Sequence, residues 1–107
     1  MVNLINNVDD FDEVLKRETA FFLLKHSLTC PISATAKEQY DEFSEKSDIP
    51  CFTLYVQDSR ELSHYIAENY KVRHESPQAL LFQNNRVKWH DSHSKIKVSN
   101  LKDATNK

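Results

Sequence analysis

The chain has no glycine among its 107 residues, and this absence constrains the backbone more than any other feature of the sequence. Glycine adopts positive φ most readily, and it forms the loops that approach phosphates and dinucleotides closely. Glycine-rich nucleotide-binding motifs are therefore excluded. Tight turns that need positive φ are expected to fall on asparagine or aspartate, and Asn84 and Asn85 are the clearest candidates.

The composition is that of an ordinary globular protein, with 39% hydrophobic and 28% charged residues. The formal net charge of −2 argues against nucleic acid or an anionic membrane as a partner, because both need a cationic surface. No apolar run is long enough to span a bilayer, and the first residues lack the layout of a secretory signal. We therefore expect one cytoplasmic domain over residues 1–107.

The spacing of apolar residues predicts alternating helices and strands. Helices are expected over residues 9–17, 31–44, from a cap at Asp58 or Ser59 to residue 70, and over 95–101, with a frayed tail at 103–107. Strands are expected over residues 20–24, 52–56, 79–82 and 87–89, the last two joined as a hairpin by Asn84 and Asn85. The first two strands enclose a helix and should pair in parallel through a right-handed crossover. This order predicts an α/β, thioredoxin-like fold with a four-stranded mixed sheet flanked by helices.

The two cysteines, Cys30 and Cys51, are too few for a disulfide framework. Cys30 follows the first expected strand and precedes a helix that starts with Pro31, a position where proline is well tolerated. Unpaired N–H groups and the helix dipole favour a thiolate there, which lowers the thiol pKa and makes the sulfur nucleophilic. Lys25 and His26 are close in the chain and are expected to add positive potential.

A second interpretation makes Cys30 a small buried core residue, as free cysteines often are. Its position between the polar Thr29 and a helix start leads us to favour a reactive thiol. Ser33 lies one helical turn further on, and its hydroxyl is expected to donate a hydrogen bond to the sulfur.

Three blocks of the sequence resemble one known family. They are Lys25-His26-Ser27 followed by Thr29-Cys30-Pro31-Ile32-Ser33, then His74-Glu75-Ser76-Pro77-Gln78, and a weaker third block of Trp89 with Ser92 and His93. With residues 60–67 they cover the chain from about Phe21 to His93. In this order they resemble the monothiol bacilliredoxins of the YtxJ type. The first two blocks are specific, whereas a Cys-Pro pair alone would be weak.

The resemblance implies a redox protein that works with bacillithiol, a low-molecular-weight thiol that carries a malate group. Members of the bacilliredoxin family remove bacillithiol from S-bacillithiolated cytosolic proteins after oxidative stress, and the resemblance implies the same activity here. Cys30 would then be the nucleophile of a thiol–disulfide exchange, with bacillithiol as co-substrate and no bound cofactor.

The residues themselves also indicate a one-cysteine mechanism. A dithiol oxidoreductase carries its resolving cysteine three positions after the nucleophile, and that position is Ser33 here. Cys51 begins the second expected strand, at the opposite end of the sheet from Cys30. The intervening helix separates these ends by roughly 18 Å, whereas bridged cysteines need Cα atoms within about 7 Å. We therefore interpret Cys51 as a structural residue.

The Ser76-Pro77 pair precedes the third expected strand, where thioredoxin-like proteins carry a cis-proline opposite the nucleophile. From the residues alone, an ordinary trans proline that opens a strand is the simpler interpretation. The resemblance favours the cis form, which would expose the Ser76 backbone for pairing with an extended substrate segment. Glu75 flanks this loop and is included among the candidate substrate-binding residues.

Basic residues near this loop are candidates for contact with the malate group, namely Lys25, Arg73 and His74. Each of them is equally compatible with a solvated surface charge. The five histidines and two cysteines show no spacing typical of a metal site, and no metal is expected.

Two other functions remain open at this point. A non-catalytic adaptor would bind a protein partner through the edge at Pro77, with Cys30 incidental. A redox sensor would accept bacillithiol at Cys30 without passing it on. An adaptor should tolerate Cys30→Ser, whereas a reductase must lose all turnover. A sensor would show capping of Cys30 without catalytic release.

Overall fold

The computed structural model describes residues 2–29 and 31–106, and it contains one mixed five-stranded sheet in the order β1-β3-β2-β4-β5. The strands are β1 (Val2–Leu4), β2 (Ala20–His26), β3 (Cys51–Tyr55), β4 (Gln78–Gln83) and β5 (Arg86–Ser92). The helices are α1 (Val8–Arg17), α2 (Pro31–Lys46), α3 (Arg60–Tyr70), the short 3₁₀ helix η1 (His93–Lys95) and α4 (Val98–Thr105).

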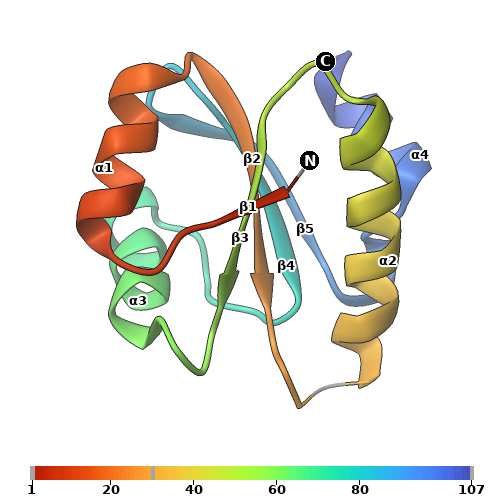
Figure 1. Cartoon of the computed structure of the whole chain (residues 1–107), viewed down its shortest axis with the longest axis horizontal. Helices are drawn as coiled ribbons and strands as arrows, with labels where there is room; N and C mark the ends of the chain where they lie inside the picture. The colour runs from red at the N-terminus through yellow and green to blue at the C-terminus, as the bar shows by residue number, and fades with distance from the viewer. Residues whose placement is uncertain (1, 30, 107) are drawn as a thin grey trace.

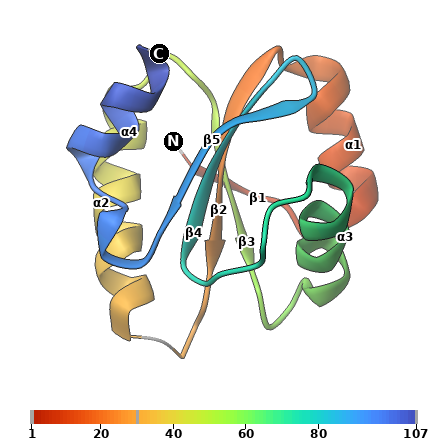
Figure 2. The ribbon, with the colours of Figure 1, turned by 180° about the vertical axis from the view of Figure 1, so that it is seen from behind.

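Helices cover both faces of the sheet, so the molecule has three layers. Figures 1 and 2 show α1 and α3 against one face and α2 and α4 against the other. The aromatic residues Phe11, Phe21 and Phe82 form the centre of the core under α1 and α3, and Tyr40 lies in the second core under α2. β2 is buried on both faces because each face is covered by helices, which explains its continuous apolar sequence.

The pairing of the strands brings three chain segments to one end of the sheet. β2 pairs in parallel with β3, so His26 lies beside Tyr55 where both strands end. β4 runs antiparallel to β2 and starts at this end, with Gln78 opposite Lys25. The loops after β2 and β3 and the loop before β4 therefore meet at the lower end of the sheet in Figure 1.

The Asn84–Asn85 turn that joins β4 and β5 is confirmed. Both residues have positive φ, 54° and 61°, as a two-residue hairpin requires. The expectation that asparagine or aspartate carries every positive φ was wrong, because Lys71 (57°) and His93 (55°) also have left-handed backbones. Lys71 ends α3 at a position that glycine usually occupies, and histidine tolerates this region better than most residues.

The sheet has five strands where four were predicted, because β1 adds a parallel edge beside β3. Three residues are too few to show an alternating pattern, so the sequence carried no clear signal for β1. The last helix also lies further along than predicted. η1 takes the first residues, and α4 continues to Thr105 because Leu101 and Ala104 are buried against α2.

Candidate functional site

The candidate site lies where β2 ends and α2 begins, at the lower end of the sheet in Figure 1. Cys30, the predicted nucleophile, lies outside the described residues. The residue after it, Pro31, is the first of α2 and is exposed, as predicted for a proline that starts a helix. The first turn of α2 contains no acidic residue, so no side chain there opposes the positive end of the helix dipole.

The loop before Cys30 is held by the side chain of Gln57, which follows β3. Gln57 Oε1 accepts a hydrogen bond from the backbone N–H of Leu28 at 3.1 Å. Its Nε2 donates to the hydroxyls of Ser27 at 2.9 Å and Thr29 at 3.3 Å. One amide side chain therefore contacts each of the three residues that lead from β2 to Cys30.

Ser33 connects the same loop to the first turn of α2. Its side chain is fully buried, and its Oγ accepts a hydrogen bond from the backbone N–H of Ser27 at 3.2 Å. The predicted hydrogen bond from Ser33 to the Cys30 sulfur involves an atom outside the described residues. In the described part, Ser33 helps to fix the geometry of the loop.

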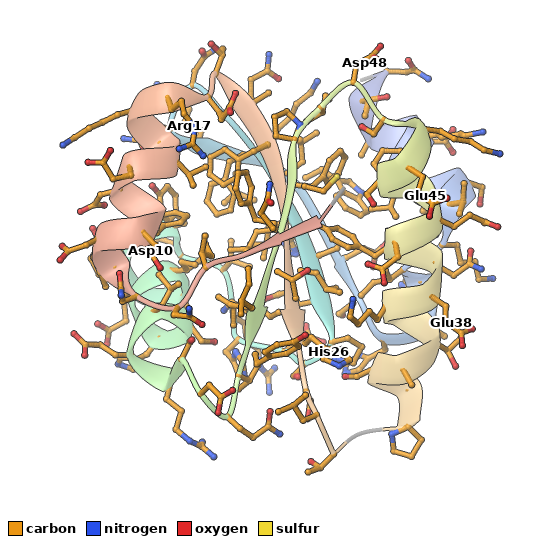
Figure 3. All side chains as sticks on the ribbon, in the orientation of Figure 1. Asp10, Arg17, His26, Glu38, Glu45 and Asp48 are labelled. Carbon is orange, nitrogen blue, oxygen red and sulfur yellow. The ribbon has the colours of Figure 1, made fainter. Side chains whose placement is uncertain are left out.

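His26 was expected to add positive charge, and the structure corrects this. Its ring is 7% exposed and lies on the α2 side of the sheet, 5.5 Å from the ring of Tyr55 (Figure 3). Burial lowers the pKa of His26, and the nearby positive charge of Lys37 lowers it further. The imidazole is therefore neutral at neutral pH.

Lys25 was expected to be a cation near the thiol or in contact with substrate, but its side chain is fully buried. Strand alternation places it on the face opposite His26, toward α3. Its Nζ donates to the carbonyl oxygen of Ser63 at 3.0 Å and lies 3.4 Å from His74 Nδ1. Burial lowers the pKa of Lys25 to about 8. A direct contact between Lys25 and a solvent-borne malate is therefore excluded in this structure.

His74 contacts the buried residues Lys25 and Ser63 but is itself exposed. Its Nδ1 lies 3.1 Å from Ser63 Oγ and faces the Lys25 amine, which as an ammonium only donates. Nδ1 therefore accepts, and the ring hydrogen lies on Nε2. Burial and the Lys25 charge lower the pKa of His74, and this direction disfavours a cationic contact from its side chain.

The bond between Ser76 and Pro77 is cis, as predicted. Pro77 is buried directly before β4, and its carbonyl oxygen accepts a hydrogen bond from the backbone N–H of His93 at 3.0 Å. Glu75 strengthens this connection, since its carboxylate accepts from Ser92 Oγ at 2.8 Å and lies 3.4 Å from His93 Nδ1. The loop before β4 is thereby tied to the end of β5.

Cys51 lies away from this end of the sheet. It pairs with Phe22, four positions before His26, which corresponds to roughly 13 Å along the strand. The thiol is buried, it donates weakly to the carbonyl oxygen of Ile49 at 3.5 Å, and burial raises its pKa to about 11. These features agree with the interpretation of Cys51 as structural.

Sequence reasoning missed Gln57 and Ser63 as parts of this site. Gln57 lies in the loop before α3 and Ser63 lies within α3, both distant in sequence from Cys30, and neither belongs to a motif. Arg73, another predicted contact, is exposed, and its carbonyl oxygen accepts from Gln78 Nε2 at 3.0 Å.

The described residues carry neither a metal cluster nor a membrane-spanning helix. There, no three histidine, cysteine, aspartate or glutamate side chains gather in a way that would hold a metal ion. Within the same residues, no helix combines the length and the apolar character needed to cross a membrane.

Known structures share this architecture. A solved thioredoxin-fold protein, described as a candidate oxidoreductase, is 41% identical, superposes with a TM-score of 0.93, and is matched over 97% of this chain and 93% of its own. The fold is shared by two thioredoxins of lower identity. That of Schistosoma mansoni is 15% identical with a TM-score of 0.79, and the match covers 98% of this chain and 95% of the thioredoxin. That of Fasciola hepatica is 9% identical with a TM-score of 0.78, and the match covers 97% of this chain and 96% of the thioredoxin. The predicted thioredoxin-like fold is thus confirmed.

The family comparison agrees with the blocks around Cys30 and Pro77. The model of the family described as monothiol bacilliredoxin BrxC matches residues 3–101, which is nearly the whole chain. Together with the 41% identical structure, this match supports a thiol–disulfide redox role. The chain belongs to the monothiol bacilliredoxin family.

Proposed function

We propose that this protein is a bacillithiol-dependent disulfide reductase that removes bacillithiol from S-bacillithiolated cytosolic proteins. The observation that carries the proposal is the buried Ser33 in the first turn of α2, where a dithiol enzyme has its second cysteine. Cys51 is buried about four strand positions from the site and is unsuited to resolve a disulfide. An external thiol must then complete the cycle.

The reaction consists of two balanced exchanges. The Cys30 thiolate attacks the bacillithiol sulfur of the mixed disulfide, a new Cys30–bacillithiol S–S bond forms, and the substrate protein leaves as a thiolate. A second bacillithiol thiolate then attacks the bacillithiol sulfur carried on Cys30. This step forms oxidised bacillithiol and regenerates the Cys30 thiolate. In the net reaction, one mixed disulfide and one free bacillithiol give the reduced protein thiol and one molecule of bacillithiol disulfide.

The described residues support distinct parts of this scheme. Gln57 and Ser33 hold the loop before Cys30, and the α2 terminus favours a thiolate. The segment around Ser76 and Pro77 enters the same end of the sheet, where an extended part of a substrate protein can lie beside the thiol.

The test is incubation of the protein with an S-bacillithiolated test protein, followed by intact-mass measurement of both. The native chain and Cys51→Ser are expected to acquire the bacillithiol mass, and Cys30→Ser is not. Release on addition of bacillithiol distinguishes a reductase from a sensor that only accepts the group. Absence of transfer to the native chain would contradict the proposal and favour an adaptor.

A further inference from the structure

A groove lies between α2 and the segment that runs from η1 to the start of α4. Figure 2 shows this segment beside the lower half of α2. The groove has a volume of about 450 Å³, which is in the range of sites for one small molecule. Its α2 wall includes Ile32, Thr35 and Gln39, and its opposite wall includes His93 and Lys97.

The groove begins next to the candidate site. Ile32 is two residues after Cys30, and covalent geometry limits the distance between the two Cα atoms to about 7 Å. His93, on the other wall, donates its backbone N–H to Pro77, so this wall is attached to the loop before β4. The groove therefore begins within two residues of the predicted nucleophile, on the side of the loop before β4.

The far end of the groove lies one to two helical turns away. Ile32 and Gln39 are seven residues apart on α2, which corresponds to about 10 Å along the helix axis. Gln39 closes this end, because its Oε1 accepts a hydrogen bond from the backbone N–H of Val98 at 3.0 Å. Lys97, the residue before Val98, is exposed there. The length matches a small thiol of two or three building blocks.

The charges of the groove distinguish between ligands. Among the described residues, the ionisable side chains that line it are His93 and Lys97, and no described carboxylate is part of the lining. The Glu75 carboxylate lies behind this wall, 3.4 Å from His93 Nδ1, which leaves Lys97 as the lining cation without a described acidic partner in the groove. The remaining lining combines hydroxyl and amide groups with the apolar Ile32 and Ile96, which suits a sugar ring better than a purely apolar ligand. Lys97 provides a fixed positive charge at the end away from Cys30, where it can pair with a carboxylate.

We propose that this groove binds bacillithiol, with its malate carboxylates at Lys97 and its sulfur at Cys30. This inference rests on the proposed function and adds to it the site of the small-molecule co-substrate. It also replaces Lys25 and His74, which lie on the other face of the sheet, as the source of the cationic contact.

The first test compares two substrates and two lysine variants. The substrates are one test protein modified either with bacillithiol or with cysteinyl-glucosamine, which lacks the malate. Lys97→Glu is expected to lower kcat/KM about tenfold for the bacillithiol substrate, and less than twofold for the one without malate. Lys95→Glu, an exposed lysine two residues earlier that does not line the groove, is the matched control and should change neither.

The second test measures binding without chemistry. Reduced bacillithiol is added to Cys30→Ser, and amide shifts are followed by NMR. Shifts are expected at residues 32–39 and 93–97, and Lys97→Glu should weaken them. Shifts confined to the Lys25 and His74 face, or equal effects of Lys97→Glu and Lys95→Glu, would overturn the groove assignment. Failure of the proposed function would appear separately, as absence of transfer by the native chain.

Discussion

The backbone N–H of Leu28 donates a 3.1 Å hydrogen bond to Gln57 Oε1, so a side chain from the loop after β3 holds the backbone two residues before Cys30. The same amide donates to Ser27 and Thr29. This arrangement couples two loops that belong to different strands. It makes the position of the segment that leads to Cys30 depend on a residue that lies outside this segment.

Gln57→Ala is therefore expected to slow bacillithiol transfer about tenfold, because small displacements of a nucleophile reduce reactivity strongly. Gln57→Glu keeps an acceptor for Leu28 and removes the donor, and its negative charge should raise the thiol pKa of Cys30. Alkylation rates measured against pH would show this shift. Gln83→Ala, at the opposite end of β4, is the matched control. If Gln57→Glu leaves the pH profile unchanged, Gln57 has only a structural role.

The burial of Lys25 is expected to make the free energy of unfolding depend on pH in the alkaline range. Burial lowers its pKa to about 8 from the ordinary value of 10.5. Between these values the unfolded chain holds a proton that the folded chain has released, so the free energy of unfolding rises with pH. From pH 7 to 9.5 the gain is about 2 kcal/mol. Lys25→Met should lack this gain, as measured by urea unfolding at both pH values.

The control for this effect is Lys88→Met, which removes an exposed lysine of β5 and should leave the gain in place. Equal pH dependence of Lys25→Met and the native chain would show that the Lys25 amine keeps its ordinary pKa despite its burial.

The pKa of His74 should depend on the positive charge of Lys25. This pKa is lowered from the ordinary value of 6.5 by burial and by Lys25. Lys25→Met removes the charge, so the imidazole of His74 should titrate at higher pH than in the native chain. NMR of the ring protons measures both midpoints. An unchanged or lower midpoint in Lys25→Met would mean that the 3.4 Å approach of the two side chains does not persist in solution.

Much of the fold could be predicted because its strongest signals are local. The apolar run of β2, the Asn84–Asn85 turn and the position of Pro77 are each visible in a few neighbouring residues. The directions of Lys25 and His26 were harder to predict. β2 is buried on both faces, so its sequence does not show which face each side chain takes. Both residues end inside the protein, where burial lowers the pKa of each side chain.

The contacts that order the candidate site are the least visible in the sequence. Gln57 and Thr29 are 28 residues apart, and they meet only because β2 and β3 end side by side. The groove beside α2 likewise depends on the path after β5, where His93 adopts a left-handed backbone. Such features follow from the assembled sheet.

The β4–β5 turn provides a test of the glycine-free backbone. Asn84 has a φ of 54°, a conformation that costs a residue with a Cβ about 1 kcal/mol unless its side chain tolerates it, as asparagine does. Asn84→Ala is expected to lower the free energy of unfolding by about 1 kcal/mol. Asn84→Gly should cost less than Asn84→Ala, because glycine adopts positive φ freely. Urea unfolding of the native chain and the two variants measures these differences. Equal stabilities would contradict the prediction and show that the turn rearranges.

The two cysteines are expected to differ strongly in their rates of alkylation, because Cys51 is buried. In Cys30→Ser, Cys51 is the remaining cysteine, and burial raises its pKa to about 11 from the ordinary value of 9.0. At pH 8 its thiolate fraction falls about 100-fold, and the enclosed sulfur is sterically shielded as well. Iodoacetamide should therefore modify Cys51 at least about 100-fold faster in urea than in the folded chain. Cys51→Ala, which retains Cys30, should react readily when folded. Rapid modification of Cys51 in the folded chain would instead show that this thiol is accessible, and the one-cysteine mechanism would lose its structural basis.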